Sequence, residues 1–267
     1  MSASNAKTAA GNYFEDFRLD QEIVHATPRT ITDGDAALYL ALYGSRFVVN
    51  CAEPFAQSLG YATTPVDDLL AFHVVFGKTV PDTSLNGIAN LGYAECRFLR
   101  PVYAGDTLST TSRVIGLKQN SNGKTGTVYV RSTGINQRGE AVIDYVRWVM
   151  VRKGNAQAPA PETVVPALSD RVSPEDFVLP DGLNAQDFDT AKSGSGFLWD
   201  DFSVAERIDH IDGMTIEEAE HMTATRLYQN TARVHFNQFT EQDGRFGRRI
   251  IYGGHIISLA RAISFNG

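Results

Sequence analysis

The spacing of apolar and polar residues in the first half of the chain predicts two helices followed by several strands. Residues 30 to 44 begin with Thr and Asp, which can cap a helix, continue through helix formers and reach Gly44, which suits a C-cap. Residues 66 to 80, VDDLLAFHVVFGKTV, are apolar nearly all round, as in a helix buried on most faces. From Gly92 to residue 152, β-branched and aromatic residues dominate, with turn signals between them. We therefore expect consecutive antiparallel strands in a meander, within an α+β fold.

The composition of the chain changes between Arg152 and Gly196. Five of the ten prolines fall in this stretch, which ends in the small residues KSGSG. Such a composition is typical of an extended connection and not of a packed element. The sequence thus predicts a first domain at residues 12 to 152, a proline-rich linker at 153 to 196 and the start of a second domain at 197 to 267.

The two domains are related by an offset of 185 residues. With this offset Phe17 aligns with Phe202, His25 with His210 and Leu42-Tyr43 with Leu227-Tyr228, without a gap. Self-similarity at a fixed offset indicates duplicated architecture. The second copy stops before the equivalents of the strands, so its helices would have no sheet to cover. We expect the natural chain to continue for about 70 more residues, which would complete the second domain.

Composition and charge exclude several classes of function. The chain is 43% hydrophobic and 21% charged, with a net charge of −7 and no basic stripe, so nucleic acid is an improbable partner. It has neither a signal peptide nor the run of about 20 apolar residues that a membrane span requires, which favours a cytoplasmic location. Cys51 and Cys96 lack metal-ligand spacing, and we expect both to be small buried hydrophobes.

Three segments resemble the mesaconyl-CoA hydratase family, a branch of the MaoC-like proteins. They are RLYQNTARVHFNQ, GRFGRRIIYGGHIISLARAISFNG and LGYAECRFLRPVYAGDTLSTTSRVIGL, and the resemblance extends over nearly the whole chain. It implies a double hot-dog fold, in which antiparallel sheets wrap long central helices, with the second hot-dog incomplete in this chain. It also implies a hydro-lyase that adds water reversibly and in syn fashion to mesaconyl-CoA, giving β-methylmalyl-CoA. No redox cofactor or metal is implied, because CoA is part of the substrate.

The same resemblance points to His235 and Asn230 as catalytic residues. MaoC-like hydratases generally carry an Asp and a His five residues apart, but in this chain Asn230 stands at the Asp position. The first copy has Ser45 and Asn50 at these positions and is predicted to be catalytically silent. His235 can exchange a proton near neutral pH, and Asn230 can hold a water molecule through its amide. The second proton-transfer group stays open. It is either Glu241 or Asp243, or His235 acts alone.

Gly253 and Gly254 are predicted to open a buried helix whose backbone N–H groups face the substrate. A helix N-terminus is a natural donor to the negative charge that develops on a thioester oxygen. The aligned residues of the first copy, Asp68 and Leu69, lack the glycine that lets a thioester approach the backbone. We assign Gly254 to catalysis and Gly253 to substrate binding.

Charged residues between these two elements are candidates for substrate binding. A free carboxylate on the acyl group, or the phosphates of CoA, would pair with an arginine. The candidates are Arg245, Arg248 and Arg249, with Arg226 and Arg233 as alternatives. Of the other histidines, His25 and His210 are expected to share a structural role, His73 to be packed, and His221 to face solvent.

Two other functions remain open at this level. A hot-dog thioesterase would need an acidic residue near the central helix, for which Asp67 and Asp68 are the candidates. A non-catalytic acyl-CoA-binding module would bind without turnover. In each case the acyl-CoA thioester is the expected partner, and a homo-oligomer, most simply a dimer, is the expected assembly.

Overall fold

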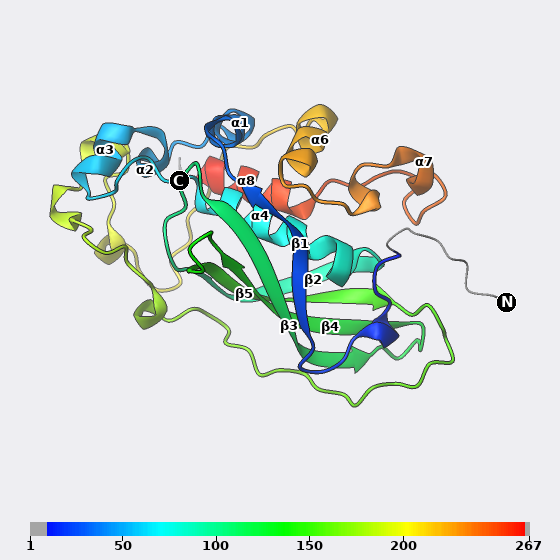
Figure 1. The fold of residues 1–267 in the computed structure, drawn as a ribbon. Helices are drawn as coiled ribbons and strands as arrows, with labels where there is room; N and C mark the ends of the chain where they lie inside the picture. The colour runs from blue at the N-terminus through cyan, green and yellow to red at the C-terminus, as the bar shows by residue number, and fades with distance from the viewer. Residues whose placement is uncertain (1–9, 265–267) are drawn as a thin grey trace.

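The computed structural model describes residues 10 to 264, and its strands form one antiparallel sheet (Figure 1). In chain order the strands are β1 (Glu22–Thr30), β2 (Gly87–Phe98), β3 (Thr107–Gln119), β4 (Thr125–Ile135) and β5 (Ala141–Arg152). Across the sheet their order is β1-β3-β4-β5-β2. The predicted meander is confirmed for β3, β4 and β5, whose tight turns contain Gly123 and Gly139 at positive φ.

The strand β2 does not follow the predicted meander. It pairs with β5 at one edge of the sheet, whereas the prediction placed it beside β3. The physical reason lies in the connection, residues 99 to 106, which is longer than a hairpin turn and contains Pro101. The N–H of Val66 donates to the carbonyl oxygen of Val102 at 2.8 Å, so this connection is anchored beside the central helix and not in a hairpin.

The first copy contains the helices η1 (Phe14–Asp16), α1 (Asp33–Tyr43), α2 (Val48–Cys51), α3 (Glu53–Ser58), α4 (Asp68–Thr79) and η2 (Val80–Ser84). Of these, α1 and α4 lie where the sequence predicts helices, whereas the four shorter ones were not predicted. The hydroxyl of Thr32 caps α1 by accepting the N–H of Asp35, and Gly44 ends α1 in the left-handed conformation, as predicted.

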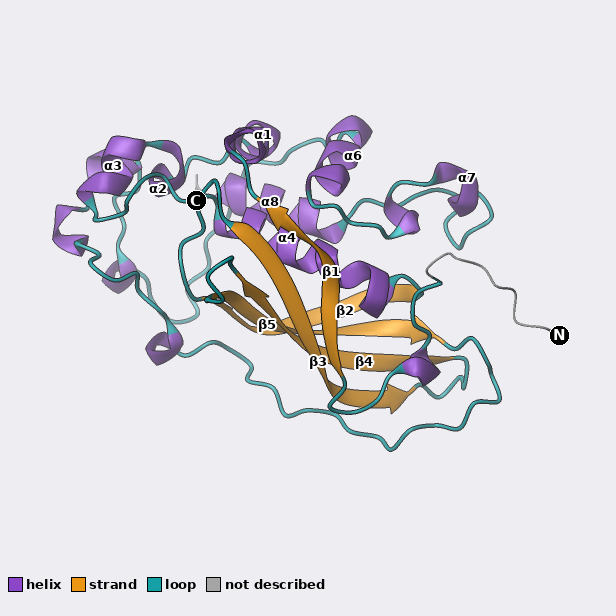
Figure 2. Cartoon of the chain, viewed as in Figure 1, coloured by secondary structure: helices purple, strands orange, loops and turns teal. Residues whose placement is uncertain are grey.

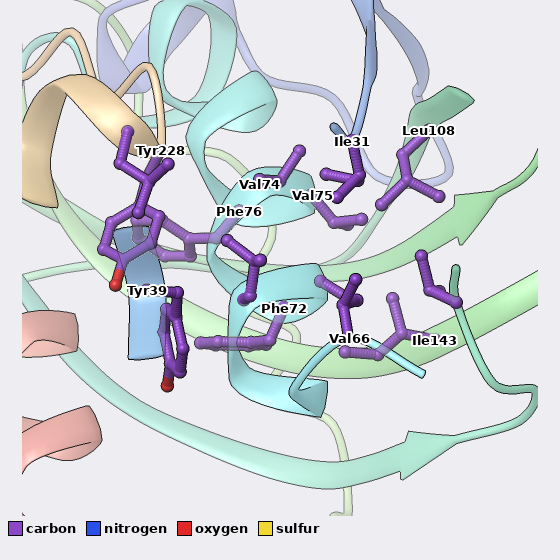
Figure 3. Close-up of a cluster of buried hydrophobic side chains, with 14 of the residues drawn as sticks. Ile31, Tyr39, Val66, Phe72, Val74, Val75, Phe76, Leu108, Ile143 and Tyr228 are labelled. Atoms are coloured by element: carbon purple, nitrogen blue, oxygen red, sulfur yellow. The ribbon is translucent and has the colours of Figure 1, made fainter. Parts of the chain in front are cut away.

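The central helix α4 packs in the concave side of the sheet (Figures 1 and 2). Every residue from Leu70 to Thr79 is buried, which confirms the prediction of a helix covered on most faces. Figure 3 shows Val74 and Val75 of this helix together with Ile31 and other core side chains. Each large apolar side chain buried in this way contributes about 1.5–3 kcal/mol to stability. The sheet and α4 therefore form one stable body that can position other elements.

The second copy repeats the helices of the first at the predicted offset. Its elements are η5 (Trp199–Asp201), α6 (Glu218–Leu227), η6 (Arg233–His235), α7 (Gln238–Glu241) and α8 (Gly253–Ile263). They begin 185 residues after η1, α1, α2, α3 and α4, respectively. Even the backbone repeats, because Asp20 and its equivalent Ala205 both have a positive φ. The duplication inferred from weak sequence similarity is thus present in the fold.

A pseudo-twofold axis relates the two copies. The hydroxyls of Tyr43 and Tyr228, which are equivalent residues, lie 2.6 Å apart. His73 Nε2 lies 3.0 Å from the hydroxyl of its own equivalent, Ser258. An element that contacts its own counterpart must lie on the symmetry axis, as in an isologous interface. Consequently α4 and α8 pack side by side, and the start of α8 meets the C-terminal half of α4 (Figure 1).

The linker follows the surface of the first copy. It contains three short helices, η3 (Pro174–Asp176), η4 (Ala185–Asp187) and α5 (Thr190–Ser193), and is otherwise irregular. It is attached by a bridge between Val164 and Leu117 and by contact of Phe188 with Phe55. In the described part of the chain all five strands belong to the first copy. The predicted continuation and the three domain boundaries stay predictions.

The expectation that both cysteines are buried is wrong. Cys51 is exposed and Cys96 only half-buried, because α2, which carries Cys51, is a surface helix without a buried residue. His25 is buried between Asp82 and Ser112, whereas His210 is exposed. The positions equivalent to those two partners lie outside the described residues, so the shared role of the two histidines stays a prediction.

Between residues 10 and 264, no helix is both long enough and apolar enough to cross a lipid bilayer.

Candidate active site

His235 is held in a single tautomer by the backbone. Its Nδ1 atom lies 3.1 Å from the carbonyl oxygen of Ile250, and since a carbonyl only accepts, Nδ1 carries the hydrogen. The other ring nitrogen, Nε2, then keeps its lone pair. Burial lowers the pKa of His235, although the Ile250 carbonyl and the carboxylate of Glu241 act in the opposite direction. His235 is therefore neutral at pH 7, with Nε2 able to accept a proton.

Asn230 is buried near the end of α6, five residues before His235. Its Oδ1 accepts the N–H of Ala232 at 2.9 Å, which fixes the orientation of the amide. Its Nδ2 is buried and has no hydrogen-bond partner in the described structure. A buried donor without a partner is uncommon and needs an explanation. An amide N–H in this position can hold a water molecule, which is the role predicted for Asn230.

The start of α8 presents backbone N–H groups that no side chain caps. The N-cap residue is Tyr252, which cannot act as Ser, Asp or Asn do in this position. Gly253 is exposed, whereas Gly254 is buried, and a Cβ on Gly254 would lie 2.4 Å from the ring of Tyr252 and 2.6 Å from Cε1 of His73. Only glycine fits there. The N–H groups of a first helical turn have no intrahelical partner, so they are available to a negatively charged oxygen.

Tyr252 contacts both His235 and the central helix of the first copy. Its ring centroid lies 5.3 Å from that of His235 and 5.8 Å from that of Phe76, which belongs to α4 of the first copy. The predicted residues His235 and Gly254 therefore both lie next to the ring of Tyr252, at the junction of α8 with α4. Both copies contribute to this candidate site.

At the equivalent position of the first copy, Asn50 makes the same kind of hydrogen bond to the backbone as His235 but cannot act as a base. Asn50 Nδ2 donates to the carbonyl oxygen of Pro65 at 3.1 Å, and Pro65 is the equivalent of Ile250. The amide of Asn50 thus replaces the Nδ1–H group of His235. It has no counterpart of Nε2, so it cannot accept a proton from water.

The helix N-terminus of the first copy is also blocked. The carboxylate of Asp67 caps α4 by accepting the N–H of Leu69, the equivalent of Gly254, at 2.9 Å. Nη1 of Arg261 lies 2.6 and 2.7 Å from the two oxygens of the same carboxylate. A negative charge already satisfies the donor that an oxyanion would need. The first copy has therefore lost both the base and the oxyanion donor.

Installing a histidine in the first copy is consequently expected to restore nothing. In a His235→Ala background, Asn50→His should leave the chain as inactive as His235→Ala alone, because Asp67 still occupies the N–H of Leu69. The measurement is turnover of an enoyl-CoA substrate by the double variant. Recovery of more than about a tenth of the wild-type rate would contradict the assignment of the first copy as blocked.

Sequence reasoning missed two further histidines near the site. His221, predicted to face solvent, is buried, and its Nε2 accepts the N–H of Tyr252 at 2.9 Å. The prediction was wrong because α6 packs against α1 and α8 on the face that carries His221. Burial lowers the pKa of His221 to about 4, so it stays neutral and holds the N-cap of α8 in place. His255 is fully buried, with Nδ1 3.1 Å from the hydroxyl of Tyr43.

A signal for these two residues exists in the sequence. The first copy has Ala36 and Leu70 where the second has His221 and His255. A polar residue that appears in one copy at an apolar position of the other marks a difference in function. Comparison of all positions across the offset, and not only those of the family motif, would have found both.

The predicted arginines are spread over the surface near α6. Arg248 and Arg249 both pair with the carboxylate of Glu218, at the start of α6. Arg245 is exposed and stacks on Phe246. Of the alternatives, Arg226 donates to a carbonyl of its own helix and Arg233 is exposed. Their role in binding stays a prediction.

A cavity of about 740 Å³ lies at the first-copy site and not at His235. Asn50, Asp68 and Arg261 line it together with apolar residues of the linker. Burial raises the pKa of Asp68 to about 6, although Arg261 opposes this effect. Among the described residues, no group of three or more His, Cys, Asp or Glu side chains is arranged to hold a metal ion.

Comparison with known proteins places these features in a family. The family model described as mesaconyl-CoA hydratase matches residues 3 to 265. The β-methylmalyl-CoA dehydratase of Chloroflexus aurantiacus is 67% identical over 263 residues, which are 98% of this chain and 75% of that protein. The mesaconyl-CoA hydratase of Cereibacter sphaeroides is 57% identical over 261 residues, which cover the same shares.

The fold of the chain matches that of a solved structure from Chloroflexus aurantiacus. A crystal structure of a MaoC domain protein dehydratase from Chloroflexus aurantiacus superposes with a TM-score of 0.95 at 67% identity. The match covers 98% of this chain and 75% of that one. The fold class predicted from the sequence, a MaoC-like double hot-dog, is thereby confirmed.

Proposed function

The chain belongs to the mesaconyl-CoA hydratase family, and on that premise we propose that it hydrates mesaconyl-CoA reversibly to β-methylmalyl-CoA. The observation that carries the proposal is the difference between the copies. The second copy has a neutral histidine with a free Nε2 and an uncapped helix start, while the first has an amide and a carboxylate at those places. These two features are the ones that hydration of an enoyl thioester requires.

The proton-transfer part of the reaction falls to His235. Its Nε2 takes a proton from water as the water oxygen bonds to C3 of the enoyl group. The same nitrogen then returns that proton to C2 on the same face, which accounts for syn addition with a single acid–base residue. The free amide of Asn230 donates to the water oxygen and orients it. This scheme needs neither Glu241 nor Asp243.

The electrostatic part falls to the start of α8. As C3 is attacked, negative charge moves to the thioester oxygen, and the N–H of Gly254 and the dipole of the helix stabilise it. His221 keeps this turn in place through the N–H of Tyr252. Addition of water involves no net oxidation or reduction, so the proposed reaction needs no redox cofactor, and the proposal assigns the charge on the thioester oxygen to the start of α8 and not to a metal.

A direct assay tests the proposal. Mesaconyl-CoA is incubated with the chain, and the loss of the enoyl-thioester absorbance and the mass of the product are recorded. A product heavier by one water supports the hydratase. Binding of mesaconyl-CoA without any conversion would instead support the acyl-CoA-binding module that the sequence left open.

The pH dependence of kcat/KM is expected to report His235. Burial lowers its pKa, so the proton-accepting form persists below pH 6.5, the ordinary midpoint of histidine. The rate should therefore be flat at neutral pH and fall only as the pH drops through that lowered pKa. The check is a kcat/KM profile from acidic to neutral pH. A midpoint above the ordinary histidine value would contradict a buried neutral base.

A thioesterase is the second candidate, and Asp68 is the observation in its favour. This carboxyl lines the first-copy cavity, and burial raises its pKa to about 6, in a range useful for a general base. Release of free CoA from mesaconyl-CoA, followed with a thiol reagent, separates the two activities. Thiol release that Asp68→Asn abolishes and His235→Ala leaves intact would favour the thioesterase.

Three further properties are part of the proposal. The binding partner is an acyl-CoA thioester, the location is the cytoplasm, and the assembly is a homodimer. The first rests on the names of the relatives. The other two rest on the sequence alone and are tested by fractionation of cells and by light scattering.

A further inference from the structure

Arg147 is an unusual residue in the interior of the first copy. It lies in the middle of β5 and is fully buried. Its Nη2 donates to the hydroxyl of Thr79 at 2.9 Å and approaches that of Ser84 at 3.4 Å. Its Nε and Nη1 atoms are buried and have no hydrogen-bond partner. Within residues 10 to 264 no carboxylate lies within 4.0 Å of this guanidinium.

The charge of Arg147 is not balanced by its neighbours. Burial lowers the pKa of Arg147, yet a guanidinium remains protonated in proteins. Its aromatic neighbour is Phe76, whose ring centroid is 4.4 Å away, and the phenols of Tyr93, Tyr145 and Tyr252 are near enough to influence its pKa. Burial raises the pKa of each phenol, so all three stay neutral at pH 7. A buried cation that lacks an anion is costly, and it indicates a ligand that supplies one.

The position of Arg147 connects it with the candidate active site. It contacts Phe76 and Thr79, which lie in the last turns of α4. The ring of Phe76 also packs against that of Tyr252, and Tyr252 contacts His235. Arg147 thus lies behind the junction of α4 and α8, on the first-copy side of the site. The buried phenol of Tyr145 adds a second polar group in the same region.

We propose that Arg147 binds the free carboxylate of a dicarboxylic enoyl-CoA, in direct contact or through one bridging water. This inference rests on the proposed function, because that function supplies a substrate with a free carboxylate, and the described residues give Nε and Nη1 of Arg147 no partner. In mesaconyl-CoA the carboxylate is bonded to C3, the carbon that water attacks, so an arginine behind that carbon both selects the substrate and orients it. The exposed Arg248 and the half-buried Arg249 already pair with the carboxylate of Glu218.

A matched pair of substrates tests this assignment. Mesaconyl-CoA and 2-methylcrotonyl-CoA share the same enoyl thioester and 2-methyl group, and differ in a carboxylate against a methyl group at C4. Arg147→Met should lower kcat/KM for mesaconyl-CoA by about 100-fold and that for 2-methylcrotonyl-CoA by less than about 3-fold. Arg147→Lys should fall between Arg147→Met and the wild type. Arg113→Met, which removes an exposed arginine of the same sheet, is the control and should change neither value.

Binding of unreactive ligands separates this inference from the proposed function. Methylsuccinyl-CoA and 2-methylbutyryl-CoA are saturated counterparts of the two substrates, and calorimetry gives their affinities. The wild type should prefer methylsuccinyl-CoA by at least about 10-fold, and Arg147→Met should abolish this preference. Equal losses with both substrates or both ligands, or no loss at all, would overturn the role of Arg147. A wild type that prefers methylsuccinyl-CoA but never hydrates mesaconyl-CoA would instead overturn the proposed function.

Discussion

Replacing His235 with asparagine is expected to lower kcat for mesaconyl-CoA by about 10³-fold, because general acid–base catalysis contributes about 10²–10⁴-fold. The structure supplies the reason to choose asparagine. At the equivalent position Asn50 already makes the hydrogen bond to the backbone that Nδ1 of His235 makes. His235→Asn should therefore keep the fold and the hydrogen bond to the carbonyl oxygen of Ile250, while it removes Nε2.

The measurement is kcat together with the affinity for an unreactive acyl-CoA and the melting temperature. The affinity and the melting temperature should stay close to those of the wild type, which isolates the loss to proton transfer. The matched control is Asn50→Ala in the silent copy, which removes a structural hydrogen bond at a cost of about 1 kcal/mol and should leave kcat unchanged. A His235→Asn variant that retains most of its turnover would show that another group is the base.

Replacing Gly254 is expected to have the next largest effect. An added Cβ would lie 2.4 Å from the ring of Tyr252 and 2.6 Å from His73, so Gly254→Ala must push the first turn of α8 away from its present position. Loss of one oxyanion donor typically lowers kcat by about 10²–10³-fold, and we expect a loss of that size. The N–H group itself is retained, so the loss comes from displacement of the donor.

Gly34→Ala is the control for this prediction. Gly34 lies in the first turn of α1, and a Cβ there would meet only the hydroxyl of Thr32, at 3.6 Å. The kcat values of both variants are compared, along with their melting temperatures. If Gly254→Ala keeps full turnover, the start of α8 is not the oxyanion donor. If it loses turnover and affinity for an unreactive acyl-CoA to the same degree, the residue acts in binding and not in the transition state.

The sequence predicted the larger part of the fold because its signals are local. The caps of α1 at Thr32 and Gly44, the apolar run of α4 and the glycine turns between strands each act within a few residues. The place of β2 could not be predicted in this way. Its pairing with β5 depends on where residues 99 to 106 pack, and that packing is a tertiary contact between Val66 and Val102.

The residues of the candidate site likewise include some that the sequence predicted and some that it did not. His235, Asn230 and Gly254 were found because a family motif and a repeat mark them in the sequence. Arg147 and the block by Asp67 were not, because each depends on a neighbour that is distant along the chain. His221 was missed for another reason, because only the positions of the family motif were compared between the copies. Arg147 meets α4 some 70 residues away, and Asp67 meets Arg261 from the other copy. Neither contact leaves a pattern in the local sequence.

By itself the sequence determined the order of helices and strands, the duplication at an offset of 185 residues and the copy that carries the histidine. These follow from local propensity and from comparison of aligned positions, which need no knowledge of contacts. The tertiary structure alone decided which charges are compensated. The cost of a buried charge depends on its surroundings, and only the folded structure shows those surroundings. It shows that the carboxylate of Asp67 is paired with Arg261. It also shows that the guanidinium of Arg147 is buried without an anion among the described residues.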